Sequence, residues 1–268
     1  MAVLTHVGGE LLEEVKLLAD AGYLEVVLTG IHVGSYGKDF GDISLIDVIE
    51  KVHEVEGIER IRLSSVEPMT FDDNFFARLP HLNKLCRHFH LSLQSGCDAT
   101  LKRMNRKYTT QEYREVVNKL RHIYPDVGIT TDLIVGFPGE TDEEFEQTVK
   151  FIDEISFSGM HIFKFSPRKG TPAAKFKNQV DPKKKEERSK IISEIARKNK
   201  EKFMNRMIGK SFRILYEQQV DDSSKFYEGL TDNYIRVITE SAYDIKGKII
   251  DTQLKSVKDD VMVGIMEK

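Results

Sequence analysis

Short β-rich runs alternate with helical patterns through the first two hundred residues of this 268-residue chain. The runs are rich in Val, Ile, Leu, Phe and Thr, and the segments between them repeat apolar residues at three- and four-residue spacing. Strands that alternate with helices form parallel βα units with right-handed crossovers. The pattern therefore predicts an α/β fold built on a parallel sheet or barrel. The expected strands span 24–30, 60–66, 88–94, 128–137 and 160–166.

The helices expected between these strands have recognisable ends. Gly22 is suited to end the first of them, because glycine readily adopts the left-handed conformation found after helix C-termini. Thr141 is suited to cap the start of the last, because acidic residues fill the turn that follows it. The expected helices span 10–22, 45–55, 111–122 and 142–155.

Small, polar and glycine residues follow all five expected strands. The active site of a βα barrel lies in the loops after the carboxyl ends of its strands. The sequence therefore predicts a binding site at that edge of the sheet. The segments are 29–30, 65–68, 94–96, 136–140 and 166–168.

The sequence changes character near Lys210. From there to the C-terminus, short runs rich in Val, Ile, Tyr and Thr alternate apolar with polar residues, and Asp, Ser, Gly and Asn separate them. Such runs predict a small all-β domain, most simply a barrel. We therefore expect a βα domain over 1–207, with a basic helix at 183–207, and a β domain over 208–268.

Composition excludes several classes of protein. A content of 40% hydrophobic and 31% charged residues is ordinary for a globular domain. No segment approaches the roughly 18 to 20 uncharged apolar residues of a membrane helix, and the N-terminus does not resemble a secretory signal. We expect a cytoplasmic protein with no membrane partner. Cys86 and Cys97 are too few for a disulfide framework and match no common zinc or iron–sulfur spacing, so no metal site is predicted.

Five segments form a specific series: LTGIHVGSYGKDFG (28–41), IRLSSVEP (61–68), HLSLQSGCDATLKRMNRKYT (90–109), TDLIVGFPGETDEEF (131–145) and FKFSPRKGTPA (163–173). In this order they resemble the tRNA methylthiotransferase family of the radical S-adenosylmethionine (radical SAM) superfamily. The form LTGIHVGSYG, together with GLTDNYIRV (229–237), most resembles the branch that acts on N6-threonylcarbamoyladenosine beside the tRNA anticodon.

The resemblance implies a six-stranded partial βα barrel followed by a small β-barrel of the TRAM type. It implies two cofactors, S-adenosylmethionine (SAM) and a [4Fe–4S] cluster that reduces and cleaves it. The resulting adenosyl radical drives replacement of the adenine C2–H by S-methyl, and a second cluster in a separate N-terminal domain takes part in sulfur delivery. The implied partners are the tRNA anticodon stem-loop and an electron donor.

Nine residues near the predicted strand ends are candidates for holding SAM. The guanidinium of Arg106 suits the methionyl carboxylate, and Glu67 suits the methionyl amine or the ribose hydroxyls. Gly136 and Gly139 would let the backbone approach a ligand closely, although a plain strand-to-helix turn also accounts for them. A solvent-facing position is the alternative for Arg106 and Glu67. The nine are Thr29, Ser65, Glu67, Gln94, Ser95, Arg106, Asp132, Gly136 and Gly139.

Basic and aromatic residues supply candidates for RNA binding. The segment 183–210 carries eleven Lys or Arg residues against four Glu, which fits either a solvated helix face or an RNA-binding surface. Tyr234 and Arg236 occupy alternate positions of an expected strand and would share one face, where an aromatic ring stacks a base and an arginine holds phosphate. The RNA-binding candidates are Lys183, Lys184, Arg213, Tyr234 and Arg236.

The chain departs from the family at the cluster. The family's ligands are three cysteines in a Cys-x3-Cys-x2-Cys loop after the first barrel strand, and this sequence contains no such loop. We therefore expect the first strand, the cluster loop and the preceding N-terminal domain to be missing, assign no catalytic residue, and expect this chain alone to be inactive. Two alternatives are a non-catalytic RNA-binding module that keeps the barrel as a scaffold, and a βα-barrel enzyme acting on a phosphorylated metabolite.

Overall fold

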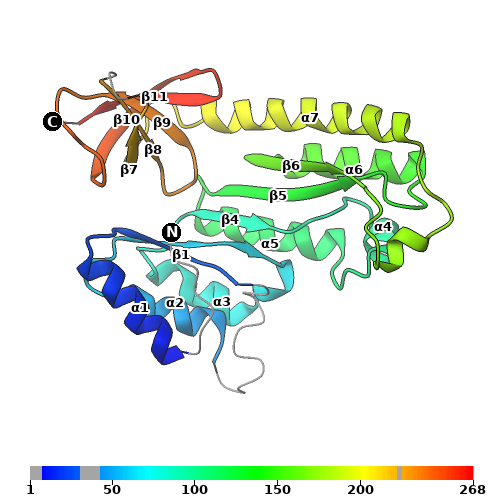
Figure 1. Cartoon of the computed structure of the whole chain (residues 1–268), viewed down its shortest axis with the longest axis horizontal. Helices are drawn as coiled ribbons and strands as arrows, with labels where there is room; N and C mark the ends of the chain where they lie inside the picture. The colour runs from blue at the N-terminus through cyan, green and yellow to red at the C-terminus, as the bar shows by residue number, and fades with distance from the viewer. Residues whose placement is uncertain (1–7, 31–42, 222–224, 268) are drawn as a thin grey trace.

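The computed structural model describes residues 8–30, 43–221 and 225–267. Most of the motif at 28–41 lies outside these residues. The described chain begins with a parallel sheet and ends with a closed β-barrel, and a long helix connects the two (Figure 1). None of the described helices is both long and apolar enough to cross a membrane.

All five expected strands are present, with shorter bounds. β1 pairs with β2, and β3, β4, β5 and β6 pair in that order, all in parallel. Only Ser64 separates β2 from β3, so the two strands are nearly continuous. A parallel bridge between Ile61 and Leu85 links β2 to the segment before β4. The strands are β1 (Glu25–Leu28), β2 (Arg60–Leu63), β3 (Ser65–Val66), β4 (His88–Leu91), β5 (Gly128–Val135) and β6 (Gly159–Lys164).

The four helices expected between the strands are confirmed, and their ends follow the signals in the sequence. Gly22 has φ +85° just after α1, and Thr141 caps α6 by accepting a hydrogen bond from the Glu144 N–H. Two six-residue helices, α3 and α4, were not predicted, because a helix of that length shows little periodicity. The helices are α1 (Gly8–Asp20), α2 (Leu45–His53), α3 (Asp73–Arg78), α4 (Asp98–Arg103), α5 (Thr110–Ile123), α6 (Asp142–Ile155) and α7 (Pro182–Asn205).

The two faces of the sheet differ, as β5 shows. Ile129, Thr131, Leu133 and Val135 are buried, and the Tyr113 hydroxyl of α5 lies 3.5 Å from Thr131 Oγ1, so this face packs on the helices. The alternating residues at 130, 132 and 134 are partly exposed and lie on the opposite, inner face. We call the space bordered by this inner face the lumen.

The C-terminal segment forms a closed barrel in the order β10-β11-β9-β8-β7. Its core holds the fully buried ring of Tyr216, whose hydroxyl donates to Thr239 and lies 3.0 Å from Thr252 Oγ1. Phe203 and Met204 from the end of α7 join this core. The last strand, β11, was not among the predicted runs. The strands are β7 (Ser211–Gln219), β8 (Phe226–Leu230), β9 (Arg236–Glu240), β10 (Ile249–Lys258) and β11 (Val261–Met266).

The turn between β8 and β9 connects the barrel to the amino edge of the sheet (Figure 1). Arg62 of β2 donates to the carbonyl oxygens of Thr231 and Asp232 at 3.2 Å each. Asn233 Nδ2 donates to the Asp126 carbonyl at 2.9 Å, and the Tyr234 ring stacks on His88 at 4.2 Å. The barrel is therefore attached to the end of the sheet opposite the predicted binding edge.

Candidate cofactor and RNA-binding sites

Two of the predicted SAM-binding residues meet at the carboxyl edge of the sheet. Glu67 follows β3 and Arg106 follows α4, and Arg106 Nη1 lies 3.0 Å from Glu67 Oε1. Both side chains remain partly exposed, at 32% for Arg106 and 46% for Glu67. A guanidinium beside a carboxylate complements the carboxylate and ammonium of a free amino acid, which is the form of the methionyl part of SAM.

Three further predicted residues lie at the same edge with accessible side chains. Thr29 follows β1 and is half-buried, and Ser65 is exposed in β3. Gln94 has φ +68°, a rare conformation for a residue other than glycine. Its N–H donates to the Asp132 carbonyl and its own carbonyl accepts from the Ile134 N–H, so its backbone stays joined to β5. These positions fit a polar ligand at the strand ends.

Ser95, Gly136 and Gly139 instead contact other parts of the chain. Ser95 is buried, with its hydroxyl 3.4 Å from Thr148 Oγ1. A Cβ atom at Gly136 would lie 2.4 Å from Cγ of Lys185, and the Gly139 N–H donates to the Asn178 carbonyl at 2.7 Å. Ser95 thus packs on α6, while Gly136 and Gly139 form the turn from β5 to α6, which packs against Lys185 of α7 and the segment before that helix.

The remaining predicted residue, Asp132, lies deeper, on the lumen face of β5. Its carboxylate is 3.4 Å from His90 Nε2, and its strand partner in β6 is His161. Asp132 is therefore separate from the pair at the carboxyl edge.

The cysteines do not fit a [4Fe–4S] cluster. Such a cluster takes three or four thiolates around one site. Cys86 precedes β4 and Cys97 follows it, so the two thiols lie toward opposite ends of that strand, and both are buried. Burial raises the pKa of the Cys86 thiol, and Cys97 donates to Gln147 Oε1 at 3.4 Å. The two cysteines of this chain therefore do not form a cluster site.

Anaerobic reconstitution with iron and sulfide should therefore leave the folded chain without stoichiometric iron. Both thiols should also react slowly with a disulfide reagent until the chain is unfolded, because both are buried and a reagent reaches them only on unfolding. Iron and acid-labile sulfide analysis, with thiol titration in buffer and in denaturant, tests both points. A stoichiometric cluster would show that the thiols are recruited by a rearrangement absent from this structure.

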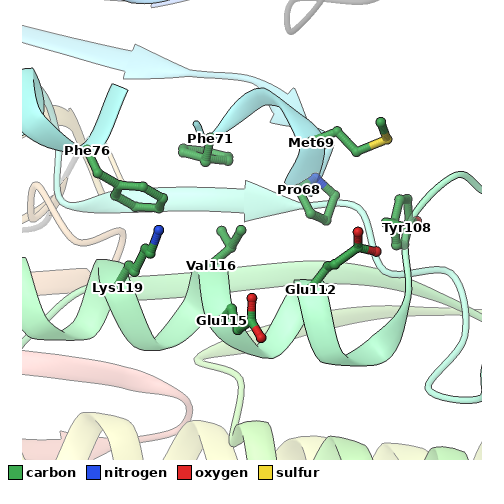
Figure 2. A pocket seen from close by; sticks show the side chains of 9 residues that line it. All are labelled: Pro68, Met69, Phe71, Phe76, Tyr108, Glu112, Glu115, Val116 and Lys119. Carbon is green, nitrogen blue, oxygen red and sulfur yellow. The ribbon is translucent and has the colours of Figure 1, made fainter. Parts of the chain in front are cut away.

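A pocket of about 200 Å³ lies beside the predicted edge, between α5 and the segment after β3, where Pro68 lines it (Figure 2). Apolar side chains line one part of it, and Glu112, Glu115 and Lys119 of α5 border the rest. None of the nine predicted residues lines it. The pocket is therefore not the predicted cofactor site.

The predicted RNA-binding residues do not form one patch. Lys183 and Lys184 lie in the first turn of α7, and Lys184 pairs with Asp142 at 2.6 Å. A 24-residue helix is roughly 36 Å long, so these lysines are far from the β-barrel. In the barrel, Arg213 pairs with Glu59 of the sheet domain at 2.9 Å, and Arg236 lies 3.6 Å from Glu228.

The prediction that Tyr234 and Arg236 share one strand face is wrong. β9 begins at Arg236, and Tyr234 lies in the preceding turn with φ +70°. Its ring stacks on His88 and faces the guanidinium of Arg62, while about half of the side chain stays exposed. The Tyr234 side chain therefore attaches the barrel to the sheet through His88 and Arg62.

The basic helix is less cationic at its surface than its sequence indicates. Lys185 and Arg188 are buried against the sheet domain, where Lys185 Nζ donates to the Phe165 carbonyl and Arg188 pairs with Glu140. Arg197 and Lys198 share Glu194. Part of the local positive charge is thus paired or buried within the chain and does not reach the surface.

In the described residues, the parallel strands carry at their carboxyl end a guanidinium–carboxylate pair that complements a free amino acid. A profile of the radical SAM superfamily matches residues 8–152, more than half of the chain. The chain belongs to the radical SAM superfamily.

Within that superfamily the chain is similar to the threonylcarbamoyladenosine tRNA methylthiotransferases MtaB of Bacillus subtilis and Thermotoga maritima. The identities are 38% and 43%, over 91% and 94% of this chain. These alignments cover 55% and 57% of the two relatives, so this chain spans about half the length of the curated relatives it matches. The solved coproporphyrinogen III oxidase HemN of Escherichia coli, a radical SAM enzyme, superposes with a TM-score of 0.57 at 13% identity, over 82% of this chain and 58% of that one. This last likeness supports the fold alone.

Proposed function

We propose that this chain provides the SAM-binding sheet and the RNA-binding barrel of a tRNA methylthiotransferase acting on N6-threonylcarbamoyladenosine beside the anticodon. The observation that carries the proposal is the similarity to two enzymes named for that activity, which extends over 91% and 94% of the chain and so includes both the sheet and the barrel. Such a function places the protein in the cytoplasm, where it would meet tRNA and an electron donor.

In this proposal Arg106 binds the methionyl carboxylate of SAM and Glu67 binds its ammonium group. Thr29, Ser65 and Gln94 lie at the same edge and would bind the polar ribose and adenine groups. Bound SAM would supply the methyl group and, on reductive cleavage, the adenosyl radical that attacks the adenine C2–H. Because the cysteines of this chain do not fit a cluster, we expect the chain alone to be inactive.

Replacing Arg106 by glutamine should weaken SAM binding by at least about tenfold, since a hydrogen bond to a charged group contributes roughly 1.5–3 kcal/mol. Isothermal titration calorimetry with the purified chain measures this. The matched control is Arg114→Gln, which removes the same charge from Arg114 of α5, whose partner at the surface is Glu154 of α6. An unchanged affinity in Arg106→Gln, or an equal loss in the control, would contradict the assigned role.

A chimera tests the full activity. The matched segment of the Thermotoga maritima relative is replaced by this chain, and the product is reconstituted with iron and sulfide. We expect methylthiolation of tRNA carrying N6-threonylcarbamoyladenosine, and little with tRNA whose adenosine lacks that group or carries another N6 substituent. A folded, cluster-containing chimera that leaves every tRNA unmodified would refute the proposed function. Modification of tRNA that carries another N6 substituent would assign the chain to a different branch of the family.

The second candidate is a non-catalytic RNA-binding module. It is favoured by the absence of a cluster site, because the two cysteines are buried at opposite ends of β4. The two proposals differ in SAM binding. A chain that binds tRNA with a strong salt dependence, as phosphate contacts require, but does not bind SAM would support the second candidate.

A further inference from the structure

Three metal-ligating side chains from three adjacent strands converge on the lumen. His90 comes from β4, Asp132 from β5 and His161 from β6, and their ligand atoms all lie within 4.8 Å of one another. The two imidazole rings are 5.9 Å apart, and His90 Nε2 is 3.4 Å from Asp132 Oδ1. The parallel register produces this arrangement, because it places Asp132 beside His161 and the neighbouring Thr130 beside His90.

The His90 ring has the orientation expected of a metal-binding histidine. Its Nδ1 lies 3.0 Å from the hydroxyl of Thr130, which also lies 2.9 Å from His88 Nε2. The other nitrogen, Nε2, is buried, makes no hydrogen bond of ordinary geometry in the described residues, and faces the Asp132 carboxylate at 3.4 Å. A metal-bound histidine characteristically donates its second N–H to a neighbouring oxygen, which fixes the ring and its tautomer. Thr130 can accept that hydrogen bond, and Nε2 then carries the free lone pair.

The surroundings permit a metal ion to enter. His161 is exposed and Asp132 keeps 30% of its side-chain surface, whereas His90 keeps 13%, so the cluster is open on one side. At the amino end of the lumen, the stack of Tyr234 on His88 lies beneath the cluster.

We propose that His90, Asp132 and His161 form a binding site for one divalent transition-metal ion, with Zn²⁺ as the ion that matches them best. Two imidazoles and one carboxylate form a common three-ligand set for zinc, and such sites leave a fourth position for a water or a substrate oxygen. Here that position faces the lumen, so its ligand would be water or a substrate oxygen. The proposal does not depend on the methylthiotransferase assignment, and it differs from the expectation of no metal site.

Zinc titration of the metal-free chain tests the site. The chain is stripped with a chelator, the chelator is removed, and Zn²⁺ is added in competition with a chromophoric indicator. One equivalent per chain should bind, and Co²⁺ at the same site should show the visible d–d bands of a four-coordinate ion. Absence of stoichiometric binding would overturn the proposal.

Two variants locate the binding. His161→Ala is the principal one, because His161 is exposed and its loss leaves the packing of the sheet intact. Asp132→Asn is the second. Each should weaken Zn²⁺ binding by at least about tenfold, since even indirect partners of ligands contribute roughly 10- to 100-fold. The control is His122→Ala, an exposed histidine on α5, which should bind as the unaltered chain does. Binding that survives in His161→Ala with unchanged affinity and Co²⁺ spectrum would place the ion elsewhere and overturn the proposal.

Discussion

Replacing Arg188 by leucine is expected to destabilise the chain by about 3–5 kcal/mol, the effect typical of removing one partner of a buried ion pair. Arg188 and Glu140 each keep only 3% of their side-chain surface. Arg188 donates to Glu140 Oε1 at 2.5 Å, to the Thr141 carbonyl at 3.0 Å and to Asp142 Oδ1 at 2.8 Å. Leucine fills much of the space but leaves the Glu140 carboxylate buried without its cation.

The loss should depend on pH with a definite sign. Burial already raises the pKa of Glu140 even with Arg188 present, and removal of the cation raises it further. A group whose pKa is higher in the folded than in the unfolded state stabilises the fold at low pH, and that contribution disappears as pH rises through the folded-state value. The stability difference between the variant and the unaltered chain should therefore shrink as pH falls from about 7 toward about 5, near the unfolded-state value for glutamate.

Urea unfolding at several pH values, followed by circular dichroism, measures both effects. Arg197→Leu is the matched control, because Arg197 lies on the same helix in an exposed pair with Glu194, and its urea midpoint should not change. A loss in Arg188→Leu as small as in the control would contradict the role assigned to the buried pair. A loss that is independent of pH would contradict the role assigned to Glu140.

Much of the fold followed from local patterns. The five parallel strands and four of the helices have periodicity and end signals within their own segments, as Thr141 and Gly22 show. The short helices α3 and α4 lack that length, and their positions depend on packing that no local pattern reports. The same limit explains Tyr234, whose alternation with Arg236 suggested a strand although the chain makes a turn there to reach His88.

The candidate site was predictable where residues follow strand ends, and much less so where function depends on register. Glu67 and Arg106 come from segments 39 residues apart, yet each follows an element that ends at the same edge, and they meet at 3.0 Å. His90 and His161 were missed because they lie inside two strands far apart in the sequence, with no ligand spacing that links them. Only the pairing of β4, β5 and β6 brings them to Asp132. The positive surface of the basic helix was overestimated for another reason. A count of charged residues does not show that Lys185 and Arg188 are buried.

The attachment of the barrel depends on a close backbone approach at Gly128, the first residue of β5. A Cβ atom there would lie 2.2 Å from the carbonyl oxygen of Asn233 and 3.5 Å from the His88 ring. The nearest atom belongs to the backbone of the turn that carries Tyr234, so it cannot move aside as a flexible side chain would. Any side chain at this position must push that turn away from the sheet.

Gly128→Ala should therefore loosen the barrel and lower the free energy of unfolding by about 1–3 kcal/mol, the usual cost of an inserted methyl group in a packed region. Limited proteolysis between α7 and β7 and small-angle scattering should show the loosening, while urea unfolding gives the energy. Gly159→Ala is the matched control. Gly159 is the first residue of the adjacent strand β6, and its added Cβ would meet only the Thr130 methyl, at 3.2 Å. If the two variants behave alike, the close approach at Gly128 does not hold the barrel. If only Gly128→Ala exposes the connection to proteolysis, the turn carrying Tyr234 fixes the barrel against the amino end of the lumen.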